Sequence, residues 1–309
     1  HFGSSHFGPT GSILQAAAVS GGPALKQAMR VAPTEGPVSL RGHTLVVPGI
    51  GGLAHLGELS VDALVTTFKL SRAAIVHSRH LLPVAMASAW EGAPGAGEVG
   101  ALKLTTAAEL YQSAAAPGLS VLQLRAPVVE GRRRALAGEL LAWAAAEGVA
   151  ELLVLASCSS HVKTDADLAA ATDLRYVRVP SESLDGAGSG ISQDVLPLGH
   201  GLPDDGLDGD SRQAAATRHL LRGSGLARSL LQLASEAAAS PDPQGVPSVL
   251  CLAGMTSDVL NWRLLEQLSR TACAHLAERP LGAAQVDLQP PPSWHFHAAM
   301  TATPQRLWG

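Results

Sequence analysis

The chain has 309 residues, of which 46% are hydrophobic, and its formal net charge at pH 7 is −4. This length allows a sizeable core in one large domain or two small ones. The slight negative charge gives little support for non-specific nucleic-acid binding, and no apolar run approaches the ~20 residues that cross a bilayer.

Residues 1–38 mix Gly, Pro, Ser and Ala with little periodicity, so we expect a disordered or weakly ordered N-terminal extension there. A regular pattern begins at residue 44. The first half is predicted to contain a strand at 44–47, a helix at about 53–68, a strand at 73–77, a hairpin and a central strand within 100–127, and a helix at 132–147.

The second half opens with "AELLVLAS", 150–157, a fully apolar run of the kind that is buried in a parallel sheet. A weaker alternating strand, "LRYVRVP", follows, and the polar residues 181–215 predict a long exposed loop. The chain then predicts a helix in "GSGLARSLLQLASEAAA", a buried strand in "VPSVLCLAG", and a last helix to about 276 that Ser257 would cap.

Strands alternating with helices predict a three-layer α/β domain with a mixed, largely parallel sheet flanked by helices. We place this domain at 39–298 and a C-terminal tail at 299–309. The three cysteines, Cys158, Cys251 and Cys273, have no paired spacing. This indicates reduced, buried thiols and a cytoplasmic or nuclear protein.

The turn after the first strand raises the question of a nucleotide site. Gly49-x-Gly51-x-x-Ala54 fits the loose dinucleotide fingerprint, but the next strand, "AAIVHSRH", lacks the acidic residue that would hold a ribose. In a phosphate-binding loop begun at Gly52, Glu58 would stand where the lysine belongs. We therefore expect these glycines to permit a tight turn and close helix–sheet packing, with no cofactor.

A second candidate is the polar stretch from Ser157 to His161, which follows the buried strand. A Ser or Cys beside a His could act as nucleophile and base. However, neighbours in sequence seldom have the required geometry, and no G-x-S-x-G elbow is present. The competing interpretation, a polar loop that caps the next helix, is the one we favour, so no catalytic residue is predicted.

Other patterns are weaker. The pairs His77/His80 and His295/His297 lack a Cys or carboxylate at ligand spacing, so no metal site is predicted. The acidic loop at 201–210 resembles a calcium loop but lacks its spacing. A regular α/β core without a convincing active site favours binding over catalysis.

Several blocks, in order over 44–298, resemble the heterodimeric proteasome assembly chaperone family, and specifically its second subunit. In the first block, Gly57, Leu59, Asp62, Leu64 and Leu82-Pro83 stand at places of the family pattern. The others are "VLQLRAPVV", "ELLAWAAAEGVAELLVLASCSSH", "LLRGSGLARSLLQ" and "PPSWHFHAAM". The acidic loop at 201–210 and the N-terminal extension depart from that pattern.

The resemblance implies a chaperone that is not an enzyme and uses no ATP. It implies pairing with the related subunit one, binding to proteasome α subunits, and help in forming the seven-membered α ring of the 20S proteasome. The alternative from the residues alone is an α/β hydrolase or phosphorylase-like enzyme that uses Ser157 to His161, with the Gly223-Ser224-Gly225 helix start as an anion site.

The chain ends in Leu307-Trp308-Gly309. Proteasome-binding tails of the hydrophobic–tyrosine–any type end similarly, and they enter pockets between α subunits where the terminal carboxylate meets a lysine. Trp308 replaces the tyrosine of that pattern. We predict that these three residues form a proteasome-binding tail; the alternative is a frayed end.

Overall fold

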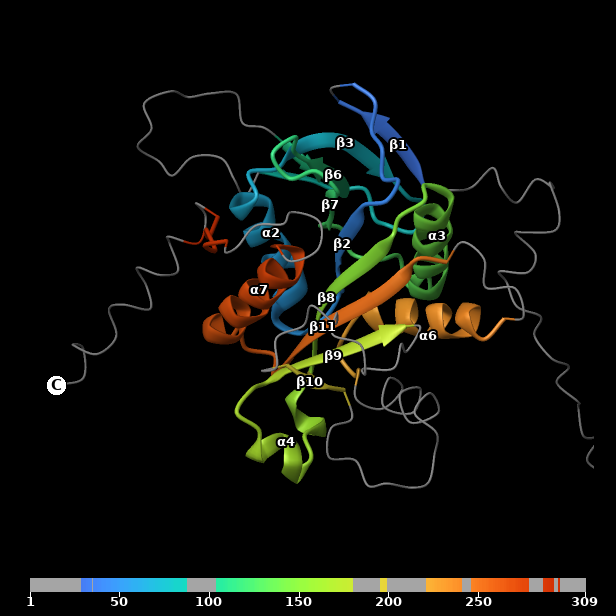
Figure 1. Ribbon diagram of the computed structural model, residues 1–309. Coiled ribbons are helices and arrows are strands. Elements are labelled where there is room, and N and C mark those ends of the chain that lie inside the picture. The colour runs from blue at the N-terminus through green and yellow to red at the C-terminus, as the bar shows by residue number, and fades with distance from the viewer. Residues whose placement is uncertain are drawn as a thin grey trace, which may run out of the picture.

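The computed structural model describes residues 29–34, 36–87, 104–179, 195–198, 221–240, 246–277, 286–291 and 294. Its centre is a nine-stranded sheet in the order β1-β3-β6-β7-β2-β8-β11-β9-β10 (Figure 1). These strands are β1 (Arg30–Pro33), β2 (Thr44–Pro48), β3 (Ser71–His77), β6 (Ala108–Gln112), β7 (Leu119–Leu124), β8 (Glu151–Ser159), β9 (Leu174–Val179), β10 (Leu196–Pro197) and β11 (Ser248–Thr256).

Strand direction follows from the pairings. The pairs β2–β7, β2–β8, β8–β11 and β9–β10 are parallel, and β1–β3, β3–β6, β6–β7 and β9–β11 are antiparallel. The predicted mixed α/β sheet is confirmed, but it is not largely parallel: four of its eight pairs are antiparallel, and the parallel pairs are the central run β7-β2-β8-β11 and the outer pair β9–β10. Two successive antiparallel steps turn β3 the same way as β7, so β3, β7, β2, β8 and β11 all end at one edge, which we call the carboxyl edge.

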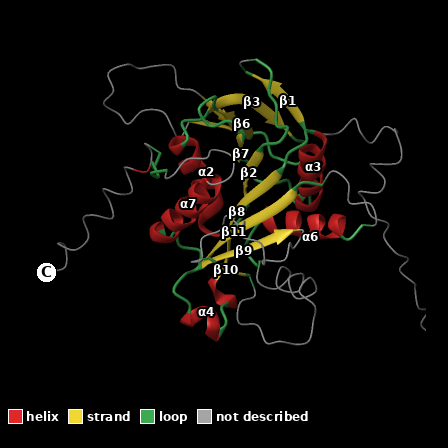
Figure 2. Cartoon of the chain, viewed as in Figure 1, coloured by secondary structure: helices red, strands yellow, loops and turns green. Residues whose placement is uncertain are grey.

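Helices cover both faces of the sheet, which confirms the three layers. Figures 1 and 2 show α2 (Leu56–Thr67) and α7 (Trp262–Leu276) on one face, and α3 (Arg133–Ala146) and α6 (Leu226–Ala238) on the other. Each pair of helices encloses its own hydrophobic cluster. The strand β8 contributes Leu152 and Val154 to one cluster and Leu153 and Leu155 to the other, which explains its unbroken apolar sequence.

The sequence missed three strand features. The edge strand β1 lies inside the stretch 1–38, where we expected little order, and it pairs antiparallel with β3. The other edge strand, β10, lies inside 181–215, where we expected a long exposed loop, and Val195 and Leu198 beside it are buried. A separate two-stranded sheet joins β4 (Ala85–Ala87) to β5 (Leu104–Thr106). All these strands are too short to give a clear alternation of apolar and polar residues.

Two helix starts also differ from expectation. Asn261 rather than Ser257 caps α7, since its Oδ1 accepts a hydrogen bond from Leu264 N at 3.1 Å. The helix α2 follows a short 3₁₀ turn, η2 (Leu53–His55), in which Ala54 and His55 have φ of 54° and 53°. Such left-handed backbone is uncommon outside glycine.

Several predictions fall outside the described residues: the extension up to residue 28, the acidic loop 201–210, and the tail Leu307, Trp308 and Gly309. The boundaries 1–38, 39–298 and 299–309 therefore stay predictions. No described helix combines the length and apolarity that a membrane span requires.

Candidate functional site

The two glycine turns meet at the carboxyl edge, where β2 and β8 end. The first turn, 49–52, follows β2, and the second, 222–225, precedes α6. Leu53 N donates to Gly223 O at 3.0 Å, and Leu226 N donates to Ile50 O at 3.0 Å. A β-bridge also joins Gly52 to Ser224. We call this contact the glycine junction.

Glycine is required here because backbones approach closely. A Cβ on Gly225 would lie 2.1 Å from Ile50 O, and φ at this residue is +58°. A Cβ on Gly57, at the start of α2, would lie 2.2 Å from Leu155 O. Because these glycines have no side chain, α2 and α6 can pack closely against the ends of β2 and β8, which is the structural role that the sequence predicted.

The backbone amides of the first turn already have protein acceptors. Gly49 N donates to Leu155 O at 2.6 Å, Gly51 N to Glu58 Oε1 at 3.2 Å, and Gly52 N to Gly49 O at 3.1 Å. In a nucleotide site such amides would face phosphate oxygens. Here a carboxylate and two carbonyls occupy those positions.

The stretch Ser157 to His161 lies beside this junction. The Ser157 hydroxyl is buried and donates to Gly223 O at 3.3 Å. Ser159 caps the short 3₁₀ helix η3 (Ser160–Val162) by accepting from His161 N at 3.3 Å. The capping role is therefore supported, but the stretch is not a loop throughout, because Ser157 to Ser159 are the last residues of β8.

The catalytic alternative lacks its geometry in this stretch. In the described part of the chain, no hydrogen bond joins the His161 ring to a serine or cysteine. Burial raises the pKa of the Cys158 thiol to about 12, which disfavours the thiolate at neutral pH. All three cysteines are buried and unbonded.

The metal candidates give no described site. His77 is exposed and His80 is buried, while His295 and His297 lie outside the described residues. Among the residues that the structure describes, no group of three His, Cys, Asp or Glu side chains converges as a metal site would require.

A buried polar contact between α2 and β7 was not predicted. The Asp62 carboxylate forms an ion pair with Arg125, whose Nη2 lies 2.7 Å from Asp62 Oδ1. Gln123 Nε2 donates to the same carboxylate and to Glu58 O at 3.0 Å. Its sequence signal was a polar residue among apolar neighbours in each element: Asp62 between Val61 and Ala63, and Gln123 between Leu122 and Leu124. It joins two blocks that the resemblance treated separately.

A second buried ion pair holds the loop after β8. Arg175, on β9, is almost fully buried, and its Nη2 lies 2.6 Å from Asp167 Oδ1 in α4 (Asp165–Ala169). Burial alone would raise the pKa of Asp167, but hydrogen bonds from Thr164 and Arg175 outweigh it and lower that pKa.

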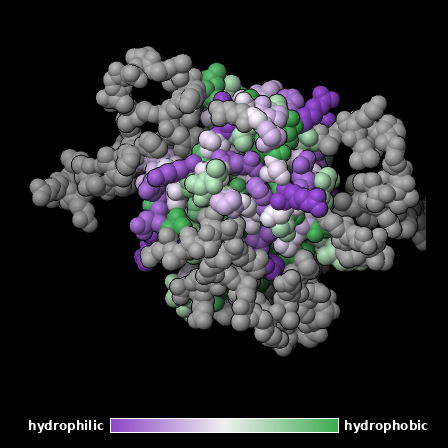
Figure 3. All heavy atoms as spheres, turned by 45° about the horizontal axis from the view of Figure 1, so that its top comes forward, coloured by the Kyte–Doolittle hydropathy of each residue, from purple (hydrophilic) through white to green (hydrophobic). Residues whose placement is uncertain are grey.

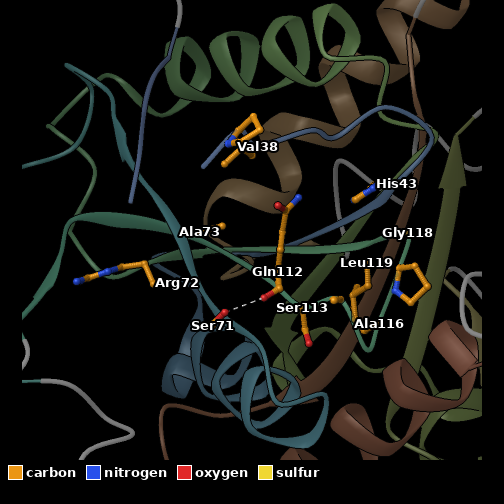
Figure 4. A pocket seen from close by; sticks show the side chains of 13 residues that line it. Val38, His43, Ser71, Arg72, Ala73, Gln112, Ser113, Ala116, Gly118 and Leu119 are labelled. Carbon is orange, nitrogen blue, oxygen red and sulfur yellow. Dashed lines mark hydrogen bonds between the residues drawn. The ribbon is translucent and has the colours of Figure 1, made fainter. Parts of the chain in front are cut away.

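The opposite edge of the sheet, where β2, β7 and β3 begin, carries an open pocket of about 350 Å³ (Figure 4). Its lining includes Val38, His43, Gln112 and Leu119. In Figure 4 the Arg72 side chain extends away from the other labelled side chains. No motif in the sequence indicated this pocket.

Two of the residues that line the pocket, His43 and Gln112, are connected through the hydroxyl of Ser120. Gln112 Nε2 donates to Ser120 Oγ at 2.8 Å, and His43 Nδ1 lies 2.8 Å from the same oxygen. Ser120 is fully buried, so its hydroxyl depends on these two partners. Burial lowers the pKa of His43, which favours the neutral ring.

The sequence model of the PAC2 family matches residues 46–248. The match runs from β2 to the first residue of β11 and includes both glycine turns. The chain belongs to the PAC2 family.

Individual relatives agree with this membership. The chain is 29% identical over 143 residues to proteasome assembly chaperone 2 of Danio rerio, and 32% identical over 138 residues to the protein of that name from Nematostella vectensis. These matches cover 46% and 44% of this chain and 52% and 54% of the relatives. The matched part thus spans about half the length of each relative.

Solved structures share the fold. The Pyrococcus furiosus proteasome activator PbaB superposes with a TM-score of 0.54 at 12% identity, covering 89% of this chain and 97% of PbaB. PbaA, described as an archaeal homologue of proteasome-assembly chaperone, gives 0.50 at 11% identity, with 89% of each chain covered. At these identities the likeness concerns the PAC2-family fold alone.

Proposed function

We propose that this PAC2-family chain is a non-enzymatic chaperone of 20S proteasome assembly. The observation that carries the proposal is the family match across the folded core, together with relatives named proteasome assembly chaperone 2. The glycine junction supports it, because protein backbone fills the place where an α/β enzyme would hold its ligand.

In this proposal the chain pairs with the related subunit one, and the heterodimer binds α subunits while the α ring forms. It works in the cytoplasm and nucleus without a cofactor. The three buried thiols are compatible with a reducing compartment. The hydrolase or phosphorylase alternative is not favoured, because the Ser157 hydroxyl and the Cys158 thiol are both buried.

The tail Leu307-Trp308-Gly309 is proposed to dock between α subunits. Burying the Leu and Trp side chains would contribute about 1.5–3 kcal/mol each, whereas association costs on the order of 4–15 kcal/mol. The tail alone would therefore bind weakly, and the folded domain has to supply further contact as a second, linked site.

Affinity capture of the tagged chain from cells, followed by mass spectrometry, tests this function. We expect subunit one and α subunits, without mature β subunits in equal amount. A chain lacking residues 307–309 should keep subunit one and lose part of the α subunits. Capture of neither partner by the intact chain would contradict the proposal.

A further inference from the structure

We propose that the carboxyl edge of the sheet binds an acidic, extended segment of a proteasome subunit through a row of exposed arginines. The row consists of Arg30, Arg79, Arg132, Arg133 and Arg222. The identity of the partner rests on the proposed function; the chemistry of the surface does not.

The five arginines come from four separate stretches of the chain that the sheet brings to one edge. Arg30 opens β1 and pairs in register with His77, the last residue of β3, and Arg79 follows two residues later. Arg132 and Arg133 begin α3, after β7. Arg222 belongs to the glycine junction, where its carbonyl accepts from Ser159 N at 2.8 Å.

Contacts within the edge show that these positions adjoin. A Cβ added to Gly51 would lie 3.8 Å from Arg133 Nη2, which places that guanidinium over the first glycine turn. Burial is the main cause that lowers the pKa of His80; the charge of Glu139 raises it, and the charges of Arg79 and Arg132 lower it. Both arginines therefore lie near this one imidazole.

Carboxylates of described residues do not neutralise the positive charge of the row. All five side chains belong to exposed residues, and none makes an ion pair with a described residue. Of the acidic groups nearby, Glu58 accepts from Gly51 N and Glu139 accepts from the Ser78 hydroxyl. Glu130 is the exposed carboxylate on the loop of Arg132.

The start of α3 also carries more positive charge than a helix N-terminus favours. Arg132 is its N-cap residue, Arg133 and Arg134 follow, and the first turn holds no acidic residue. A helix N-terminus carries partial positive charge, so cations there lower the stability of the helix. Among the three, Arg134 is compensated by Glu236 at 2.6 Å. Local conflicts of this kind are expected at functional sites.

The dimensions fit a short extended segment. From β1 to β8 the sheet crosses five strand intervals, roughly 24 Å, which about seven extended residues would span. Leu82 adjoins the row, because its N–H donates to Pro127 O at 3.0 Å, and its side chain is exposed. An apolar side chain among the acidic ones would therefore find a contact.

The opposite end of the same edge carries charges of both signs. Asp165 follows β8 and Asp258 follows β11, while Arg263 lies in the first turn of α7, and all three are exposed. The row of arginines is therefore distinct from that end, and from the whole molecule, whose net charge is −4. Figure 3 shows the described surface in one view as mainly hydrophilic, with hydrophobic residues in small separate areas.

The test compares charge reversals at the two edges of the sheet. Arg132→Glu/Arg133→Glu changes the row, and Arg41→Glu/Lys69→Glu makes the same change in charge at exposed residues of the opposite edge. Fluorescence anisotropy measures binding of a labelled peptide of about eight residues, mostly Glu with two Leu. Circular dichroism melts confirm that both variants fold.

The row variant should bind the acidic peptide at least about ten-fold more weakly than the intact chain, and the control variant should stay within about two-fold. The difference should shrink as salt rises from about 0.02 M to 0.5 M, since screening shortens the range of charge. Equal binding by the two variants would overturn the proposal. Tighter binding of a single-stranded oligonucleotide than of the peptide would also overturn it. The same holds if the only effect of the row substitutions is that the protein no longer associates with itself.

A second arm separates this proposal from the proposed function. The same variants are tested for binding to purified proteasome α subunits. If the intact chain binds no subunit but binds the peptide through the row, the function fails and the surface stands. If the intact chain binds subunits and the row variant binds them and the peptide equally well, the surface fails and the function stands.

Discussion

The two edges of the sheet differ in what their sequences suggest and in what their structures contain. The carboxyl edge carries the glycine fingerprint of a ligand site, yet backbone groups of 49–52 and 222–225 fill it. The opposite edge, where β2, β7 and β3 begin, carries no motif, yet it holds the open pocket that His43 lines. Glycine patterns at strand ends thus report close backbone packing as readily as phosphate binding, and the two are distinguished by which atoms accept from the turn amides.

The largest expected effect breaks the glycine junction. Gly225→Ala should lower the free energy of unfolding by on the order of 3–5 kcal/mol or prevent folding, because the new Cβ meets Ile50 O and φ is positive. The matched control is Gly138→Ala in α3, whose Cβ would meet nothing nearer than 3.8 Å. It should raise stability by about 0.5–1 kcal/mol. Urea unfolding measures both, and similar values for the two would contradict the close packing.

The next effect concerns the buried contact behind the carboxyl edge. Asp62→Ala should cost about 3–5 kcal/mol, because it removes a buried carboxylate that accepts from both Arg125 and Gln123. The exposed pair of Arg134 with Glu236 serves as control, and Glu236→Ala should cost no more than about 1 kcal/mol. Chemical denaturation at neutral pH compares the two. An Asp62→Ala protein as stable as the control would show that the contact contributes little.

A substitution at Gly51 tests the cost of the positive φ alone, because an added side chain would have space there. Gly51 has φ of +73°, and the nearest atom to an added Cβ is Arg133 Nη2 at 3.8 Å. Gly51→Ala should therefore cost only about 1–2 kcal/mol, from backbone strain alone. Gly51→Asn, which tolerates this backbone better, should cost less. If Asn proves worse than Ala in thermal melts, side-chain space rather than φ limits this position.

The last prediction is that nucleotides do not change the thermal stability of the chain. ATP and NAD at millimolar concentration should leave the melting temperature of the chain unchanged, because the amides of Gly49, Gly51 and Gly52 already donate to protein acceptors. A ligand that binds the folded state raises the melting temperature. A reproducible, saturable increase with either nucleotide would restore the cofactor interpretation.

The sequence revealed the elements with strong patterns and missed those whose partners are distant in the chain. The apolar run of β8 and the glycines before α2 and α6 were sufficient to predict buried strands and tight turns. The strand β1 has four residues, and it is stabilised by pairing with residues of β3 that lie 41 to 47 positions later in the chain. The pairing of Asp62 with Arg125 joins residues 63 positions apart, and an aspartate within a helix does not by itself identify so distant a partner.

The candidate site was predictable in location and only partly in meaning. Sequence patterns placed Ser157 to His161 and both glycine turns at strand ends, and the structure brings them together. That the turns bond to each other depends on three-dimensional proximity, which no spacing within either turn encodes. The arginine row is likewise spread over four separate stretches of sequence.

Reconstitution of the α ring tests the central claim most directly. Purified α subunits are mixed with the chain and its subunit-one partner, and native mass spectrometry follows the yield of seven-membered rings over time. The account predicts more correct rings and fewer other oligomers when both proteins are present, with no nucleotide added. An unchanged yield and unchanged distribution of oligomers, at concentrations where both proteins are folded and paired, would contradict it.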